Sequence, residues 1–144
     1  MHPDQNPARI ALLYNEHHYH AKVVQLARCL ADTNVHIWLE GAGSDLPEEL
    51  AECDLILVEA FGTVDNERQA MLNQIRAGSR APVVMLTSGE RAERTIEGLL
   101  AGADAVISLS TALDVMVAHC RALLRRWQTQ HRYMHSMGPD FSHV

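Results

Sequence analysis

Carboxylate and hydroxyl side chains stand at or just after the ends of short apolar runs in this chain. The segments in question are Tyr14–Asn15–Glu16, Glu59–Ala60, Thr87–Ser88 and Ser108–Leu109–Ser110. Carboxylates hold hard cations such as Mg²⁺ or accept a phosphoryl group, and hydroxyls act as nucleophiles or hydrogen-bond partners. Phosphoryl transfer also needs positive charge around the phosphoryl oxygens, normally from a metal ion and a cation.

A second group of candidates is His17-His18-Tyr19-His20. His17 and His20 are about one helical turn apart and could share a metal ion with Glu16, but zinc takes four ligands and no cysteine lies close in sequence. The same residues fit the exposed first turn of a helix. We expect no metal site here. A metal or small-molecule sensor that uses Tyr14 and His17 stays an alternative.

Signatures of common enzyme classes are absent. Thr87-Ser88-Gly89-Glu90 lacks a Gly-x-Ser-x-Gly elbow, and Ser88 is expected to cap the following helix. Gly41-Ala42-Gly43 lacks the third glycine of a dinucleotide-binding loop. Cys29 and Cys120 lie at apolar helical positions and are expected to be small core residues. We therefore expect neither enzymatic activity nor a cofactor.

Composition excludes several functions. The 144 residues carry a net charge of −6, which disfavours a basic nucleic-acid module. The apolar runs are far shorter than the roughly 18 residues of a membrane span, and the polar N-terminus carries no secretory signal. Three scattered cysteines make neither a disulfide framework nor a metal motif. We expect a cytoplasmic protein without a membrane segment.

Short apolar runs alternate with stretches of helical periodicity. The runs are Ile10–Tyr14, Val35–Leu39, Leu55–Val58, Val83–Leu86 and Ala105–Ile107. The helical stretches centre on Val23–Leu30, Leu46–Cys53, Met71–Ile75, Ile96–Leu100 and Leu113–Leu124. Uninterrupted apolar runs are typical of parallel strands covered on both faces, so the alternation predicts a doubly wound α/β fold. A ferredoxin-like fold is disfavoured because no Asn-Gly or Asp-Gly turn joins two runs.

The pattern also divides the chain. Residues 1–8 are expected to be a flexible N-terminus, residues 9–127 the domain, and residues 128–144 a linker or tail. Gly102 is expected to end a helix in the left-handed conformation. Beyond Arg126 the apolar periodicity stops, and Gly138-Pro139 follows in a polar stretch.

The chain resembles the receiver domain of bacterial two-component response regulators over about Arg9 to Arg126. The resemblance is carried by Asp54-Leu-Ile-Leu-Val-Glu59, Pro82-Val-Val-Met-Leu-Thr87, Gly102-Ala-Asp104 and Arg121-Ala-Leu-Leu-Arg-Arg126. It implies a CheY-like, flavodoxin-like fold with five parallel strands in the order 2-1-3-4-5. The last of these segments resembles the final helix of receivers that precede a winged-helix DNA-binding domain.

The chain departs from the receiver pattern at its charged positions. The resemblance places Tyr14 and Asn15 where two Mg²⁺-holding acids stand, and Glu59 where the phosphoacceptor aspartate stands. It places Leu109 at the lysine that pairs with the phosphoryl group, while Thr87 keeps the family's hydroxyl. No cation is expected at this vestigial pocket, which also includes Glu16. Mg²⁺ binding and normal phosphotransfer are therefore not expected.

The resemblance also implies a switch and dimer face formed by the fourth helix, the fifth strand and the last helix. Its candidate residues are Arg94, Glu97, Asp104, Val106, His119 and Arg121, with Val106 at the family's aromatic switch position. Leu100 and Ala105 stand where acids are usual, and this predicts a homodimer with a more apolar seam.

The sequence thus predicts an atypical receiver that acts in signal transduction or transcription regulation through protein contact or dimerisation. A histidine kinase or another signalling protein is the expected partner, and DNA would be bound only through a further domain. A phosphorylatable response regulator stays an alternative, with Glu59 or Asp54 as acceptor. Asp54 is disfavoured because it starts a strand. Whether Glu59 imitates a phosphorylated aspartate stays open at this point.

Overall fold

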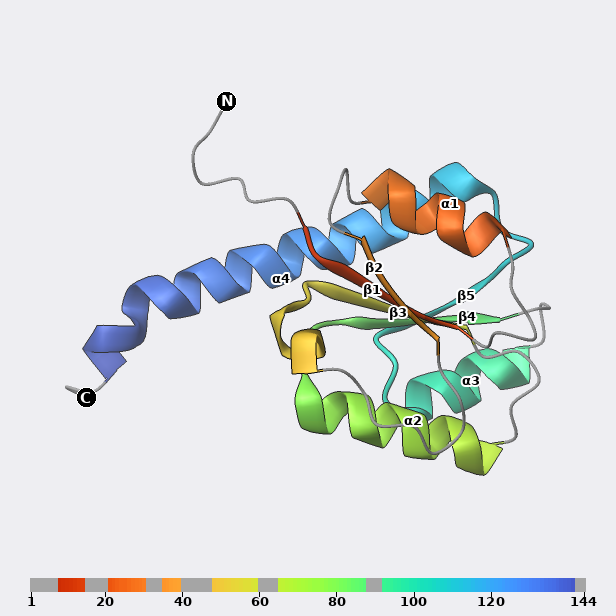
Figure 1. Ribbon diagram of the computed structural model, residues 1–144, viewed down its shortest axis with the longest axis horizontal. Coiled ribbons are helices and arrows are strands. Elements are labelled where there is room, and N and C mark those ends of the chain that lie inside the picture. The colour runs from red at the N-terminus through yellow and green to blue at the C-terminus, as the bar shows by residue number, and fades with distance from the viewer. Residues whose placement is uncertain are drawn as a thin grey trace.

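The five apolar runs form one parallel sheet (Figure 1). The computed structural model describes residues 8–14, 21–30, 35–39, 48–59, 65–87 and 92–141. The strands are β1 (Ile10–Tyr14), β2 (Val35–Leu39), β3 (Leu55–Glu59), β4 (Val83–Thr87) and β5 (Ala105–Ser108). They lie in the order β2-β1-β3-β4-β5, and all four neighbouring pairs are parallel. The predicted doubly wound α/β fold and its strand order are confirmed.

Helices cover both faces of the sheet. They are α1 (Ala21–Leu30), the 3₁₀ helix η1 (Glu48–Glu52), α2 (Asp65–Gly78), α3 (Ala92–Ala101) and α4 (Leu113–Phe141). In Figure 1, α1 and the first half of α4 lie on one side of the sheet, and α2 and α3 lie on the other. The stretch Leu46–Cys53, predicted as a short helix, contains η1; a five-residue element of this kind is typically 3₁₀.

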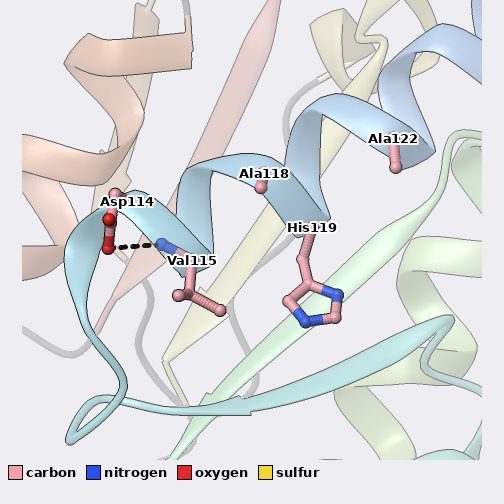
Figure 2. A pocket seen from close by; sticks show the side chains of 5 residues that line it. All are labelled: Asp114, Val115, Ala118, His119 and Ala122. Atoms are coloured by element: carbon pink, nitrogen blue, oxygen red, sulfur yellow. Dashed lines mark hydrogen bonds between the residues drawn. The ribbon is translucent and has the colours of Figure 1, made fainter.

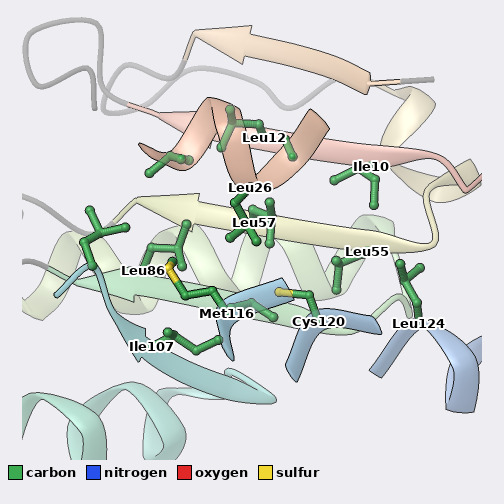
Figure 3. Close-up of a cluster of buried hydrophobic side chains, with 14 residues drawn as sticks. Ile10, Leu12, Leu26, Leu55, Leu57, Leu86, Ile107, Met116, Cys120 and Leu124 are labelled. Carbon is green, nitrogen blue, oxygen red and sulfur yellow. The ribbon is translucent and has the colours of Figure 1, made fainter. Parts of the chain in front are cut away.

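The uniformly apolar strands supply two cores. Ile10, Leu12 and Leu57 belong to the cluster beneath α1 and α4 (Figure 3), whereas Ala11 and Leu13 belong to a second cluster with α2. Successive strand residues point to opposite faces, so a strand that is covered on both sides must be apolar throughout. All five positions of both β3 and β4 are buried.

The end of α3 follows the expected capping rule. Gly102 has φ of +117°. The amide of Gly102 donates to the carbonyl of Leu99 (3.1 Å), and the amide of Ala103 donates to that of Gly98 (3.1 Å). This pair of bonds is a Schellman motif, in which glycine relieves the steric cost of the left-handed conformation.

The last helix is longer than the sequence pattern indicates. α4 continues through Trp127 to Phe141, about 43 Å at 1.5 Å per residue, and projects well past the sheet (Figure 1). Trp127 helps to explain the continuation, because its half-buried ring packs on the second core and its Nε1–H donates to Asp54 Oδ1 (3.2 Å). The segment predicted as a linker or tail is thus helical over most of its length, while the boundary at residue 127 stays a prediction.

Two further observations qualify the sequence analysis. Cys120 is buried as expected, but Cys29 is exposed, because apolar spacing alone does not tell which side of α1 meets the sheet. Despite the length of α4, no helix in the described ranges has an apolar stretch that could cross a bilayer.

Candidate functional site

Three of the predicted pocket residues meet at the carboxyl edge of the sheet. Glu59 is the last residue of β3 and Thr87 the last of β4, and Leu109 follows β5 directly. The strand register pairs Glu59 with Leu86 and Thr87 with Ser108. The amide of Leu109 donates to the carbonyl of Thr87 (2.8 Å), which joins the loop after β5 to β4.

These three side chains are buried. Glu59 is 3% exposed, Thr87 4% and Leu109 7%. Burial of a carboxylate is costly in free energy unless polar groups or charges compensate for the lost water. These three positions therefore supply a buried acid, a hydroxyl and an apolar side chain, and none of the three supplies the positive charge that stabilises a doubly charged phosphoryl group.

The other predicted pocket residues are only partly covered by the structure. Tyr14 ends β1, but its side chain lies outside the described residues. Asn15, Glu16 and the cluster His17–His20 also lie outside them. Among the residues that are described, no group of three or more His, Cys, Asp or Glu side chains could hold a metal ion.

One cation lies at this edge, where the sequence pattern predicts none. The ammonium group of Lys22, in the first turn of α1, donates to the carbonyl of Leu109 (2.7 Å) and also to that of Thr111. Lys22 and Leu109 are 87 residues apart, so no local pattern could have paired them. The one available signal was compositional, because Lys22 is the only lysine in the chain.

Asp54, the alternative phosphoacceptor, lies at the opposite edge of the sheet. Its Oδ2 accepts the amide of Arg9 (3.0 Å) and its Oδ1 accepts the indole N–H of Trp127. Its own amide donates to the carbonyl of Arg9 (2.8 Å). This carboxylate therefore ties the start of β1 and the middle of α4 to β3, and it is remote from the candidate pocket.

Comparisons with solved structures identify the fold. No family model matches the sequence, and no curated protein does. A two-component response regulator from Clostridium difficile is 20% identical, with a TM-score of 0.60, covering 82% of this chain and 97% of that one. A CheY-like receiver domain protein from Methanospirillum hungatei is 17% identical, with a TM-score of 0.60 and coverage of 85% and 98%. The chain has the receiver fold.

The receiver fold also occurs in a protein from Burkholderia pseudomallei described as pilus assembly-related. That protein is 13% identical, with a TM-score of 0.61, and the match covers 81% of this chain and 90% of that chain. Matches at such low sequence identity show that the fold is shared. What this chain does must be argued from its own residues.

In this receiver fold, the helices next to β5 in sequence carry exposed apolar side chains. Within the described residues, the exposed large apolar side chains are Ile96, Leu99 and Leu100 on α3 and Val115 on α4. Leu100 is 82% exposed. We call α3, β5 and the first half of α4 the α3–β5–α4 face, which corresponds to the predicted dimer face.

A shallow hollow marks the α4 part of this face (Figure 2). It has a volume of about 430 Å³ and is lined by Asp114, Val115, Ala118, His119 and Ala122. Four of these residues recur at helical spacing along one side of α4, and Asp114 Oδ1 accepts the amide of Val115 (2.9 Å). Small side chains at positions 118 and 122 leave room for the hollow, and the exposed His119 forms part of its lining.

Two predicted face residues, both exposed, also make contacts within the domain. A carboxylate oxygen of Asp104 accepts the amide of Val83 (2.7 Å) and pairs with the guanidinium of Arg76 at the amino edge of the sheet. Arg121 donates to the carbonyl of Cys29 at the end of α1 (3.2 Å). Asp104 thus links β5 to β4 and α2, and Arg121 links α4 to α1.

The remaining predicted face residues lie on the two helices and on β5. Glu97 and His119 are exposed, on α3 and α4 respectively, and Val106 is half-buried on β5. Arg94 belongs to α3, but its side chain lies outside the described residues.

Proposed function

We propose that this chain is a receiver-fold signalling domain that acts through protein contact and self-association, without enzymatic activity and without phosphorylation of residue 59. The observation that carries the proposal is that Glu59 and Leu109, which follow two strands at the same carboxyl edge, are both buried. Leu109 stands where the receiver family places the lysine that pairs with the phosphoryl group.

Electrostatics supports this proposal. An acyl phosphate on residue 59 would add close to two negative charges to an edge where Thr87 and Leu109 carry no charge and the ammonium of Lys22 already donates to the carbonyls of Leu109 and Thr111. Tyr14 and Asn15 stand where Mg²⁺-holding acids are usual, and one carboxylate is a weak site for a cation that prefers an octahedron of oxygens. Neither the metal nor the lysine that normally stabilises the transferred group has its usual side chains here.

A glutamate at position 59 weakens the pocket further. Its side chain is one methylene longer than aspartate, so an acyl phosphate on it would extend beyond the position at which Thr87 serves the aspartyl form. Thr87 is 4% exposed, and it lies on the neighbouring strand within one register step of Glu59. The retained hydroxyl is consistent with an inherited architecture that no longer serves phosphotransfer.

The contact function is assigned to the α3–β5–α4 face. Apolar side chains that stay exposed on a folded domain mark surfaces where another protein binds. The predicted partner is a second copy of the chain, because symmetric dimers are the commonest assembly of soluble proteins and one apolar patch can serve both subunits. Signalling proteins such as a histidine kinase are the expected upstream contacts.

The experiment that tests the proposal is phosphorylation with a small acyl phosphate in the presence of Mg²⁺, followed by intact-protein mass spectrometry. We expect the wild-type protein to keep its mass, whereas a phosphorylatable receiver treated in parallel gains a phosphoryl group. The appearance of a phosphoryl adduct on the wild-type protein overturns the proposal. A Glu59→Gln variant then shows whether residue 59 is the acceptor.

A further inference from the structure

The only lysine of the chain bonds to the loop that connects β5 with α4. The Nζ of Lys22 donates to the carbonyl of Leu109 at 2.7 Å and to that of Thr111. All eleven other strongly basic side chains of the chain are arginines. The chain thus contains lysine at a single position, and the ammonium group there donates to two backbone carbonyls.

The chemistry of this contact suits an ammonium group. Lysine presents three N–H donors around one small nitrogen, which can serve carbonyls that converge from different directions. A guanidinium is planar and spreads its donors in a fork that fits carboxylates better. In this chain Arg76 illustrates the contrast, because its guanidinium spans from the carbonyl of Ala81 (2.7 Å) to the carboxylate of Asp104.

The loop held by Lys22 leads directly into α4. The amide of Leu109 donates to Thr87 (2.8 Å), and the amide of Thr111 donates to the carbonyl of Ser108 (3.0 Å). The hydroxyls of Ser108 and Ser110 lie 2.8 Å apart in a hydrogen bond. The carbonyl of Ala112 then accepts the amides of Val115 and Met116, which starts the helix.

We propose that Lys22 is the positioning residue that holds the β5–α4 loop, and with it the start of α4, in a single conformation. Two charge-assisted bonds from one ammonium fix carbonyls that α4 itself does not use. The loop is thus clamped between α1 on one side and the end of β4 on the other. By the resemblance, receivers carry their lysine within this loop. Here the cation is Lys22 of α1, and its ammonium bonds to backbone carbonyls of the loop.

This role deepens the proposed function and rests on it in one respect only. The first turns of α4 carry Val115 and Ala118, so a fixed loop keeps this part of the α3–β5–α4 face preformed. The clamp itself is a property of the folded chain, and it can be measured whether or not the face binds a partner.

The first test is amide hydrogen exchange on the full chain with Lys22→Met, which keeps the aliphatic length and removes the donors. We expect the amides of Leu109 and Thr111 to exchange roughly tenfold faster or more, since hydrogen bonds from charged groups are lost. Amides at the opposite edge, such as that of Asp104, keep their wild-type rates. Lys22→Arg, which keeps charge and donors, restores part of the protection.

Arg121→Met is the matched control. Arg121 also joins α1 to α4 by a side-chain bond to a backbone carbonyl, that of Cys29, but it does not contact the loop. We expect this variant to leave the exchange of Leu109 and Thr111 within about twofold of wild type. Equal loop exchange in wild type and Lys22→Met overturns the proposal, and so does equal acceleration by Arg121→Met, which would indicate general loosening of α1 from α4.

The second test needs no variant and therefore does not depend on how one folds. Reductive methylation modifies only amines, so Lys22 and the N-terminal amine are the two targets in this chain. We expect Lys22 to react at least roughly tenfold more slowly in the folded protein than in urea, because its ammonium is engaged with the loop. Equal reactivity in both states overturns the clamp.

The outcomes for Lys22 and for the proposed function are distinguishable. Accelerated loop exchange in Lys22→Met together with a monomeric wild-type protein keeps the clamp and refutes self-association. Unchanged loop exchange together with a dimeric, unphosphorylated wild-type protein refutes the clamp and keeps the proposed function.

Discussion

Gly98 of α3 lies so close to Val106 of β5 that a Cβ atom on Gly98 would come within 2.6 Å of Val106 Cγ2. The same atom would lie 3.2 Å from the sulfur of Met85. The missing side chain at position 98 is what lets α3 approach the sheet, and Val106 fills the space. A short branched side chain is thus held against a helix backbone, at the position where the resemblance to receivers predicts an aromatic switch residue.

Substitution of Gly98 by alanine is expected to destabilise the protein by about 1 kcal/mol. Overpacking costs roughly 1–3 kcal/mol, and the gain in helix propensity of up to about 1 kcal/mol offsets part of it. Val106 cannot turn aside cheaply because its χ1 angle is restricted. Urea denaturation measures the change in the free energy of unfolding. Because Val106→Ala removes the Cγ2 atom that a Cβ at position 98 would meet, Gly98→Ala should cost less in a Val106→Ala background than in the wild-type protein.

Gly78→Ala is the matched control for this substitution. Gly78 is the last residue of α2, and a Cβ there meets no atom within 4 Å. We expect an unchanged or slightly higher free energy of unfolding. Equal destabilisation by both alanines would show that the contact with Val106 is not the cause.

Self-association through the α3–β5–α4 face predicts that Leu100→Glu yields a monomer. The side chain is 82% exposed, so the charge should disturb no intradomain packing, and the stability should stay within about 0.5 kcal/mol of wild type. Sedimentation velocity of both proteins measures the effect. Gln74→Glu adds the same charge to an exposed position on α2 and should leave the dimer intact. A wild-type protein that is monomeric, or a Leu100→Glu variant that still dimerises, would contradict the assignment.

The buried thiol of Cys120 predicts a loss of stability at alkaline pH. Desolvation by burial raises the pKa of Cys120 from 9.0 to about 12. Between these values the unfolded chain releases a proton that the folded chain retains, so the free energy of unfolding falls as pH rises. The slope approaches about 1.4 kcal/mol per pH unit for one such group. A Cys120→Ala variant should be less stable at neutral pH but show a shallower alkaline slope; an unchanged slope would exclude Cys120 as the cause.

The contact between Trp127 and Asp54 predicts a measurable role for the middle of α4. Trp127→Phe keeps an aromatic ring and removes the N–H that donates to Asp54 Oδ1, which should lower the free energy of unfolding by about 1 kcal/mol. Trp127→Ala also loses the packing of the ring on the second core and should cost more. Urea denaturation followed by circular dichroism measures both variants. Wild-type stability in Trp127→Phe would show that the hydrogen bond contributes nothing.

The strands were predictable because their signals are local, whereas their order was implied by the resemblance to receiver domains. A buried parallel strand needs four or five consecutive apolar residues, and the runs beginning at Ile10, Leu55 and Val83 meet this need wherever the rest of the chain lies. The same holds for the left-handed Gly102 at the end of α3. The identities of Glu59, Thr87 and Leu109 could likewise be read directly, since strand ends mark the carboxyl edge.

The contacts between distant residues could not be anticipated in this way. Lys22 and Leu109 are 87 residues apart, and Trp127 and Asp54 are 73 apart. Periodicity likewise treats Cys29 and Cys120 as equivalent, although one is exposed and the other buried. Short-range patterns specify which segments are strands or helices, because backbone hydrogen bonding and side-chain spacing act over a few residues. Which side chains meet across the sheet depends on how the helices pack on it, and that packing places the lone ammonium of Lys22 at the β5–α4 loop.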